Sequence, residues 1–501
     1  MRPLKWITAP PPALADNVSN AGVLPTDFFE LTAVESAQLI CSGAVTSRQL
    51  VEGYLTRILA KKTLNAFISV DACAALAQAD AYDQRLREGK PGLPLGGVPI
   101  AIKDNIQVKG FANTAGTPAL AQFYPSANAP VVDRLLSAGA IVIGKTNMQE
   151  LAYGTSGYNT AFHEPGMVGV RNAYDPSKIA GGSSSGNASA VGARLVPMAL
   201  GTDTGGSIRQ PCALNGCVGF RPTVGRYSQQ GITPISHTRD TAGPMARSVE
   251  DVIALDQIVT GLDPVEPPKP EAIRLGVPAQ FWAELSLEVD TLAEQALEQL
   301  EAAGFQLVPV SMPGIFELDA RVGMPIALYE GKSDMQKYLA VSGSEVSYEH
   351  LVRQISSPDV REIFERYITP QKISDATGNL VDLAPAYSWA ITQGVPALMQ
   401  MYRDVVQDNR LDALVFATTP DVAITSEPSA TSFAAFARMI RNADPGSNAR
   451  LPGLTLPIGL GPRSGLPVGL EIDGLPDSDG KLLAIGLAMQ SVLGRQTGPT
   501  H

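Results

Sequence analysis

The chain has 501 residues, of which 45% are hydrophobic and 17% charged, and its composition predicts a globular protein with a large core rather than a disordered chain. The net charge of −11 at pH 7 disfavours nucleic acids and anionic membranes as partners, because both repel an excess of carboxylates. No apolar run reaches the ~18 residues of a membrane-spanning helix, so we expect no membrane association.

The first 30 residues (1–30) are predicted to form an arm outside the folded domain. Their sequence contains prolines where a secretory signal would need a continuous apolar core. Four cysteines are too few to cross-link a chain of this length, and the spacing of Cys212 and Cys217 fits no zinc motif. We therefore expect a cytoplasmic protein with reduced thiols, no metal site and no cofactor.

Predicted helices and strands alternate along the first part of the chain. Residues 47–60 carry apolar side chains at helical spacing behind a Thr/Ser start, and residues 71–88 predict a second helix, rich in alanine. Residues 96–104 (GGVPIAIKD) predict a short buried strand. Residues 131–147 predict a helix, a C-capping Gly139 and another strand. This alternation is typical of an α/β fold.

The same order of elements returns in the second part of the chain. Residues 289–310 predict a helix followed by a strand, and further strands are expected near 411–420 and 466–472. Between them, residues 311–400 show an irregular and more polar helical pattern. We interpret this segment as a helical, cap-like insertion over the functional site, because variable segments usually carry specificity.

Two glycine- and serine-rich segments, 181–186 (GGSSSG) and 201–207 (GTDTGGS), are the most informative part of the sequence. Glycine is retained where the backbone needs unusual dihedral angles or close approach. Two such loops could present hydroxyls and backbone N–H groups to one place, which a serine nucleophile with an oxyanion hole requires. A phosphate-binding loop is disfavoured, because no P-loop lysine follows the glycines.

Lys103 closes the strand predicted within 96–104, where a charged ammonium group would be costly. It could form an ion pair with Asp104, or it could be a neutral amine that serves as a base. Lowering a lysine pKa from about 10.4 to about 7.5 costs roughly 4 kcal/mol. Lys145, in the sequence GKTN, is a second candidate for the role of base.

The sequence from Gly181 to Cys212 resembles the amidase signature family. The resemblance continues through 215–228 and includes the segments GGVPIAIKDNI, AGAIVIGKTNMQELAYG and LPVGLEI in the family's order. It implies an α/β/α sandwich around a large, mixed and twisted β-sheet. It also implies a single amidase domain over 31–501, with the cap-like insertion at 311–400.

Carried over residue by residue, the resemblance implies a catalytic triad in which Ser207 is the nucleophile, Ser183 a bridging serine after a cis peptide bond, and Lys103 the general base. It implies that the oxyanion hole is formed by backbone N–H groups of Thr204, Gly205 and Gly206, together with that of Ser207. The residues implied to support the loops are Asp203, Arg209 and Ser184. The residues implied to bind substrate are Ala152, Gly154 and Thr155.

The implied activity is hydrolysis of the C–N bond of aryl-substituted amides through an acyl-enzyme, with anilides, carbamates and esters as further substrates. Residues 218–245 most resemble the branch of the family that contains mandelamide and indoleacetamide hydrolases, although His237 stands where that branch usually has proline. The alternative is an amidotransferase A-type subunit that supplies ammonia to a tRNA-dependent partner. The sequence TRDTAG (238–243) departs from that subunit's pattern. The chain is compatible with a monomer or a homodimer.

Overall fold

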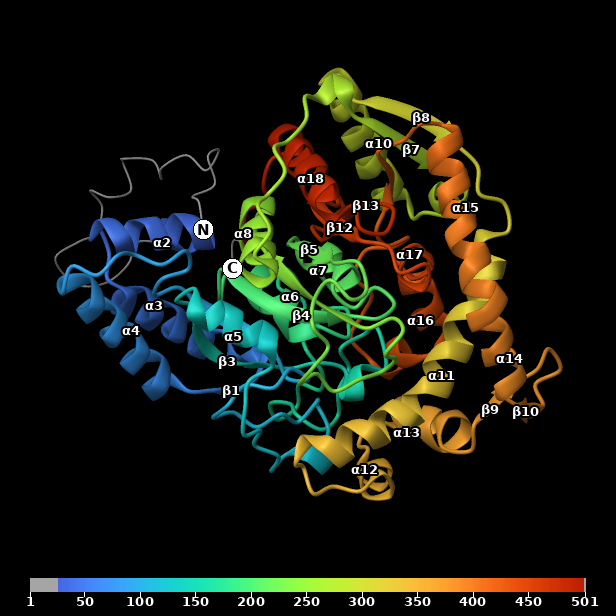
Figure 1. Ribbon diagram of the computed structural model, residues 1–501, viewed down its shortest axis with the longest axis horizontal. Helices are drawn as coiled ribbons and strands as arrows, with labels where there is room; N and C mark the ends of the chain where they lie inside the picture. Colours follow the sequence, from blue (N-terminus) through green and yellow to red (C-terminus); the bar gives the residue numbers. More distant parts are fainter. Residues whose placement is uncertain (1–25, 500–501) are drawn as a thin grey trace.

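The computed structural model describes residues 26–499, so most of the predicted N-terminal arm lies outside the described residues. The fold is an α/β/α sandwich around a mixed sheet of 11 strands in the order β1-β3-β2-β4-β6-β5-β12-β13-β11-β7-β8 (Figure 1). The strands of this sheet are β1 (Phe67–Val70), β2 (Pro99–Lys103), β3 (Ile141–Thr146), β4 (Met198–Asp203), β5 (Val218–Arg221), β6 (Thr241–Ala246), β7 (Arg274–Pro278), β8 (Gln306–Val310), β11 (Ala413–Ala417), β12 (Gly453–Leu460) and β13 (Pro467–Asp473).

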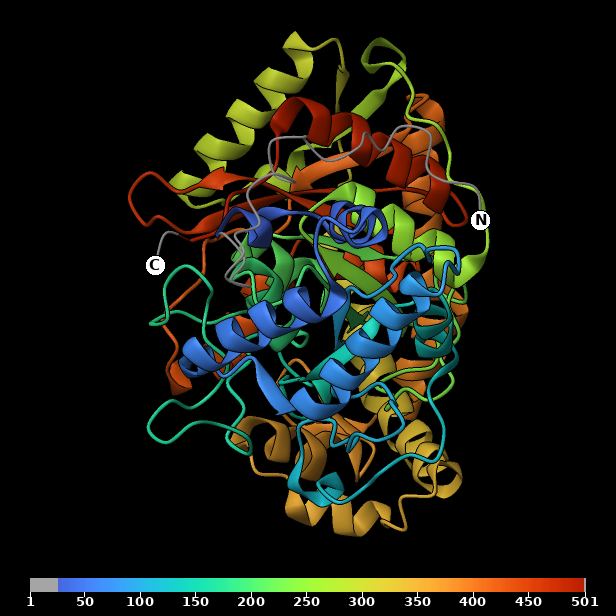
Figure 2. The ribbon, with the colours of Figure 1, turned by 90° about the vertical axis from the view of Figure 1, so that its left-hand side faces the viewer.

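Helices flank the sheet. Helices α10 and α18 lie together on one side of β12 and β13 (Figure 2), whereas α7 packs against β5, β12 and β13 and against α6. The α-helices are α2 (Ala33–Ser42), α3 (Ser47–Ala60), α4 (Ala72–Arg87), α5 (Pro130–Ser137), α6 (Ser185–Gly192), α7 (Arg209–Asn215), α8 (Val249–Thr260), α9 (Ala279–Trp282), α10 (Leu287–Ala302), α11 (Ile315–Ser342), α12 (Tyr348–Gln354), α13 (Pro358–Ile363), α14 (Ala384–Trp389), α15 (Val395–Asp408), α16 (Phe433–Ile440), α17 (Asp444–Asn448) and α18 (Asp479–Leu493). None of the helices in residues 26–499 is both long and apolar enough to cross a bilayer.

The predicted helix-and-strand units are confirmed. Helix α3 begins at Ser47 because Thr46 and Gln49 form a capping box, in which each side chain bonds the other's backbone N–H. Helix α5 ends just before Gly139, whose φ of +92° is a conformation that glycine adopts without strain. The later units follow the same pattern, with α10 leading into β8, with β11 inside its predicted range, and with β13 ending one residue beyond its predicted range.

The strand predicted within 96–104 is β2, and all five of its residues are buried. It pairs in parallel with β3 on one side and with β4 on the other. Because parallel strands end at the same edge of a sheet, the carboxyl end of β2, at Lys103, lies beside the carboxyl end of β4, at Asp203. This edge brings the lysine to the second glycine-rich segment, although they are about 100 residues apart in the sequence.

Residues 311–400 are largely helical and run along one flank of the molecule (Figure 1). Helix α11 packs against α17, α14 and α15, and a short hairpin of β9 (Lys372–Ser374) and β10 (Leu380–Asp382) is the second sheet of the described residues. The π-helical turns at Phe364–Ile368 and Ala390–Gly394 account for the irregular period of the sequence here. Helix α11 contributes residues to the pocket described below.

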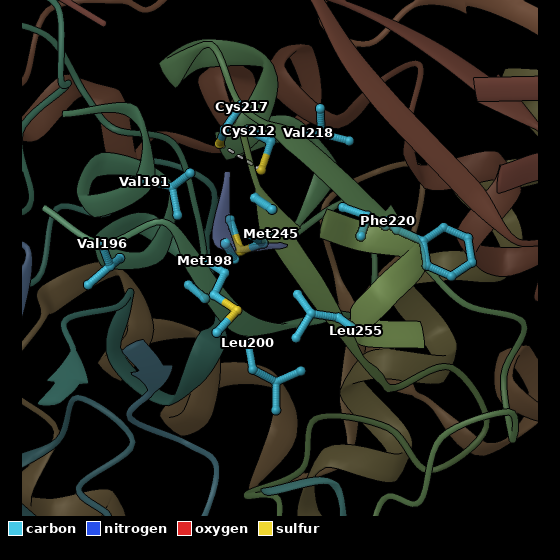
Figure 3. Close-up of a cluster of buried hydrophobic side chains, with 14 of the residues drawn as sticks. Val191, Val196, Met198, Leu200, Cys212, Cys217, Val218, Phe220, Met245 and Leu255 are labelled. Atoms are coloured by element: carbon cyan, nitrogen blue, oxygen red, sulfur yellow. Dashed lines mark hydrogen bonds between the residues drawn. The ribbon is translucent and has the colours of Figure 1, made fainter. Parts of the chain in front are cut away.

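Cys212 and Cys217 lie in an apolar cluster with Val191, Met198 and Phe220 (Figure 3). Both thiols are fully buried and free, and their Sγ atoms are 2.9 Å apart. Burial raises the pKa of the Cys212 thiol well above its ordinary value. The two cysteines therefore serve as small core residues, as their spacing indicated.

Candidate active site

Lys103 is fully buried, and its ammonium nitrogen lies among hydroxyl groups. Its Nζ is 2.9 Å from Ser183 Oγ and 2.7 Å from Thr202 Oγ1. Among the described residues, no carboxylate lies within ion-pair distance of this nitrogen. Burial lowers the pKa of Lys103 to about 7, an effect that the more distant Asp203 and Asp240 oppose. A large fraction of the amine is therefore neutral near pH 7.

Asp104, the expected ion-pair partner of Lys103, is paired with Lys145 instead. Lys145 Nζ lies 3.2 Å from Asp104 Oδ1, and both side chains are fully buried. Lys145 also donates to Asn113 Oδ1 at 3.2 Å, while Thr114 donates its N–H and its hydroxyl to Asp104. Of the two candidate lysines, Lys103 is thus the one beside a serine hydroxyl.

The first glycine-rich segment places Ser183 two residues before the start of α6. The peptide bond between Gly182 and Ser183 is cis, as the family resemblance implied. Ser184 Oγ donates to the Thr202 carbonyl at 3.0 Å, which fastens this loop to the end of β4. Gln210 accepts from the Gly182 N–H at 2.9 Å, so helix α7 also holds the loop.

Ser207 lies in the turn between β4 and α7 and is 8% exposed. Its carbonyl accepts from the Ser184 N–H at 3.1 Å, which joins the two glycine-rich segments through their backbones. No side chain in residues 26–499 hydrogen-bonds Ser207 Oγ. Lys103 and Ser183 are therefore joined by a hydrogen bond, whereas Ser207 lies in the adjoining loop with a hydroxyl that no side chain of these residues binds.

Asp203 organises the turn that carries Ser207. Its Oδ1 accepts from the Gly206 N–H at 2.8 Å and its Oδ2 from the Ile208 N–H at 3.1 Å, so the residues on both sides of Ser207 are held. Although burial acts against its charge, Arg209 and Arg221 hold the pKa of Asp203 well below its usual range. The carboxylate is therefore ionised throughout the physiological pH range.

A fully buried charge cluster surrounds Asp203. Arg209 contacts Asp203 at 3.2 Å, bonds Glu471 on β13 and donates to Ser447 at 2.6 Å. Arg221 Nε lies 3.4 Å from Asp203 Oδ1. Each partner would be costly to bury alone, so the cluster fixes the relative positions of β4, α7 and β13.

Backbone N–H groups are the expected oxyanion donors. The Gly206 N–H is already engaged by Asp203. In contrast, the N–H groups of Gly205 and Ser207 donate to no acceptor among the described residues. The Thr204 side chain is turned to Asp240, to which it donates at 2.6 Å. The Thr204 N–H likewise donates to no acceptor in the part of the chain that the structure describes, so Thr204, Gly205 and Ser207 are the donors that remain available in this turn.

The three residues implied to bind substrate have different surroundings. Ala152 lines the pocket that adjoins the Ser207 turn, and its φ of +65° marks a tight turn. Gly154 and Thr155 do not line this pocket; the Thr155 carbonyl accepts from Gln210 Nε2 at 3.2 Å. Of the three, only Ala152 is thus placed at the pocket surface.

The pocket has a volume of about 180 Å³, below the roughly 300–1,000 Å³ typical of drug-sized ligands. Its lining includes Thr202, which contacts Lys103, and Thr204, which precedes Ser207 in the same turn. The remaining lining comes from Ala152, the residues after β2, the segment that leads into and begins β6, and helix α11. The lining residues are Asn105, Ala152, Thr202, Thr204, Gln229, Ile232, Thr233, Pro234, Ile235, His237, Asp240, Thr241, Asp334 and Lys337.

Several functional neighbours were not identified from the sequence. Thr202, which contacts Lys103, is inside the quoted segment GTDTGGS and could have been recognised as a further hydroxyl there. Glu471 is the only charged residue in the apolar run LPVGLEI, and a lone charge in a buried strand signals a buried partner. Asp240 and Arg221 carry no such signal, because their contacts depend on the sheet order.

Known proteins resemble this chain over most of its length. The Amidase family model matches residues 49–483. The chain is 60% identical to mandelamide hydrolase of Pseudomonas putida over 95% of this chain and 94% of that protein. It is 40% identical to indoleacetamide hydrolase of Rhizobium radiobacter, over 89% and 93% of the two chains.

Solved structures share the fold. The native peptide amidase of Stenotrophomonas maltophilia superposes with a TM-score of 0.79 at 30% identity, over 95% of this chain and 99% of that one. The A-type subunit of the glutamyl-tRNA(Gln) amidotransferase of Thermotoga maritima has a TM-score of 0.72 at 26% identity, over 94% and 96%. The chain therefore belongs to the amidase family, and it is a hydrolase of amide C–N bonds.

Proposed function

We propose that the chain hydrolyses small aryl-substituted acetamides to a carboxylic acid and ammonia, with Ser207, Ser183 and Lys103 as its catalytic triad. The observation that carries the proposal is the buried Lys103 amine, 2.9 Å from Ser183 Oγ and without a nearby carboxylate among the described residues. The names of the relatives, mandelamide hydrolase and indoleacetamide hydrolase, support a substrate with one aromatic group. A pocket of about 180 Å³ suits substrates of that size.

In the proposed acylation step, Ser207 Oγ attacks the amide carbonyl carbon. The Ser207 proton passes to Ser183 Oγ, and the Ser183 proton passes to the neutral Lys103 amine. The carbonyl oxygen becomes an oxyanion, for which the Thr204, Gly205 and Ser207 N–H groups are the available donors. Asp203 keeps this turn in place while the charge develops.

When the tetrahedral intermediate collapses, the C–N bond breaks and the leaving nitrogen receives the proton from Lys103 through Ser183. Ammonia departs, and the acyl group remains as an ester of Ser207. Water then attacks this ester by the same route in reverse, and the acid is released. The proposed steps use side chains and backbone N–H groups of this chain together with water, and we expect neither metal nor cofactor to be required.

The same acyl-enzyme chemistry extends to anilides, aryl carbamates (urethanes) and esters, whose leaving groups are often better than ammonia. We include these as proposed substrates of lower priority. We further propose that the enzyme is cytoplasmic, acts on small molecules rather than nucleic acids, and functions as a monomer or homodimer.

The runner-up function is that of an amidotransferase A-type subunit. Its support is the fold shared with the Thermotoga maritima protein, at 26% identity. The 60% identity to mandelamide hydrolase favours a self-sufficient hydrolase. The two functions differ in whether the chain alone, without ATP, tRNA or a partner protein, turns over an amide.

The test combines turnover with covalent labelling of the purified chain. Ammonia release is measured for mandelamide, phenylacetamide and indoleacetamide, and product release for a nitroanilide and an aryl carbamate. Intact-protein mass spectrometry follows treatment with phenylmethylsulfonyl fluoride, on wild type, Ser207→Ala and the control Ser42→Ala. Ser42 is a suitable control because it is an exposed serine at the end of α2.

We expect one sulfonyl adduct and rapid amide turnover in wild type and Ser42→Ala, and the loss of both in Ser207→Ala. Removal of a catalytic nucleophile should lower kcat by at least ~10³-fold. Turnover that persists in Ser207→Ala would refute the triad. Absence of turnover in the wild type with every amide would favour the amidotransferase function.

A further inference from the structure

The loop before β6 is attached to helix α11 by two carboxylates that are one helical turn apart, Glu330 and Asp334. Glu330 Oε2 accepts from Ser236 Oγ at 2.6 Å and from Thr238 Oγ1 at 3.0 Å. Asp334 Oδ2 accepts from the His237 N–H at 2.8 Å and lies 2.9 Å from His237 Nδ1. Both carboxylates thus face the loop that lines the pocket.

Asp334 differs from Glu330 in having one oxygen that remains available. Tyr387 OH donates to Glu330 Oε1 at 3.0 Å, so both Glu330 oxygens are engaged. By contrast, no hydrogen bond within residues 26–499 ends on Asp334 Oδ1. Its nearest cation is Lys337 Nζ at 3.8 Å, on a side chain that is 75% exposed. A carboxylate oxygen can accept two hydrogen bonds, so Asp334 retains acceptor capacity.

Asp334 lies beside the exposed residues of the pocket lining. The side chain of Asp334 is 6% exposed and lines the pocket, and its neighbours His237 and Lys337 are 55% and 75% exposed. The lining also includes the buried Thr202, which contacts Lys103, the buried Thr204, and the apolar residues at 232 and 235. A substrate whose amide binds beside Thr202 and Thr204 would direct the far side of its ring toward Asp334.

The geometry points to Asp334 as a specificity-determining residue that favours substrates whose aromatic ring carries a hydrogen-bond donor opposite the amide side chain, such as a phenolic hydroxyl or an aromatic amine. This inference rests on the proposed function. A donor would fill the open acceptor site on Oδ1 with a charge-assisted hydrogen bond. A methyl group of similar size would leave the carboxylate oxygen desolvated and unpaired, which is unfavourable.

The test compares 4-hydroxyphenylacetamide with 4-methylphenylacetamide, and uses the ratio of their kcat/KM values within each protein. A ratio cancels any loss that a variant causes to both substrates alike. The proteins are wild type, Asp334→Ala, the milder Asp334→Asn, and the control Glu349→Gln. Glu349 is an exposed acid on α12 that does not line the pocket.

We expect wild type and Glu349→Gln to prefer the hydroxylated substrate by about tenfold or more. In Asp334→Ala the preference should fall to near unity, and in Asp334→Asn it should be reduced. A wild-type ratio at or below one, or an unchanged ratio in Asp334→Ala, would overturn the inference.

Binding of the two amides to Ser207→Ala protein, by calorimetry, gives a second readout that does not depend on turnover. We expect the hydroxylated amide to bind more tightly, and the added substitution Asp334→Ala to remove the difference. If neither amide is hydrolysed by wild type but the binding preference is present, the proposed function fails while this inference stands. Equal affinities for the two amides would refute the inference even where hydrolysis occurs.

Discussion

Lys103 and Lys145 are two fully buried lysines near the ends of neighbouring parallel strands, β2 and β3, yet their surroundings differ. The register pairs Ile102 with Lys145 and Lys103 with Thr146. Because side chains alternate along a strand, the two lysines project from opposite faces of the sheet. Lys145 meets a carboxylate, that of Asp104, whereas Lys103 meets the hydroxyls of a serine and a threonine.

Burial alone therefore does not make a lysine a base. Burial lowers the pKa of both lysines, but Asp104 opposes this at Lys145 from a distance of 3.2 Å. That ion pair commits the Lys145 ammonium group to the structure. At Lys103 the neighbouring hydroxyls can exchange protons with the amine, so this lysine is available for chemistry. The same substitution should therefore mainly lower activity at Lys103 and mainly lower stability at Lys145.

The substitution Lys103→Met should nearly abolish activity. Methionine is close in volume to lysine but cannot accept a proton, so the step from Ser207 through Ser183 loses its base. We expect kcat/KM for the preferred amide to fall by at least ~10³-fold, within the range of general acid–base catalysis. Thermal unfolding should change little, because no buried ion pair is broken. Activity within tenfold of wild type would contradict the assignment of Lys103.

The second expected effect is that of Lys145→Met on stability. This substitution leaves Asp104 as a buried carboxylate without its cation, which is expected to cost about 3–5 kcal/mol of unfolding free energy. Chemical denaturation measures this cost, and Lys103→Met, measured alongside, should lack it.

The double variant Lys145→Met/Asp104→Asn provides the control for this interpretation. It removes the uncompensated charge, while the side-chain oxygen of the introduced asparagine can still accept from the Thr114 N–H. We expect it to regain part of the lost stability. If Lys145→Met instead retains wild-type stability and loses turnover, the roles of the two lysines would have to be exchanged.

The sequence was sufficient to predict β2 with its terminal lysine and the two serine-bearing loops, because these signals are local. A buried apolar run ending in lysine and two clusters of glycine and serine need no knowledge of the fold. The sequence left two alternatives for Lys103, an ion pair with Asp104 or a neutral amine that serves as a base. That choice depends on the register of β2 against β3, which includes an irregularity between Ile100 and Ala101. A one-residue change in register would exchange the faces of the sheet.

Contacts between distant segments account for the rest of what the sequence did not predict. Glu471 reaches Arg209 across 262 residues, and Asp334 reaches His237 across 97. Nothing in the local sequence specifies such pairs. His237 was noted only as a departure from proline, yet its bonds to α11 connect the pocket loop to the helical segment 311–400. A proline at this position could not donate the backbone N–H that Asp334 accepts.

The smallest expected effect concerns the pH at which Lys103 becomes active. With a pKa of about 7, the amine is charged and inactive below pH 7 and neutral above it, so kcat/KM should rise with pH and level off.

Burial raises the pKa of Asp240 to about 6, and above that pH its negative charge stabilises the Lys103 ammonium. In Asp240→Asn the activity profile should therefore shift to lower pH, with a few-fold gain at pH 6 relative to the variant's own maximum. The local contacts can persist, because the asparagine oxygen can accept from the Ile235 and Ser236 N–H groups and its amide can donate to Thr204. A shift to higher pH would show that Asp240 acts on the loop rather than on the charge of Lys103, and a wild-type profile flat from pH 6 to 9 would contradict lysine as the base.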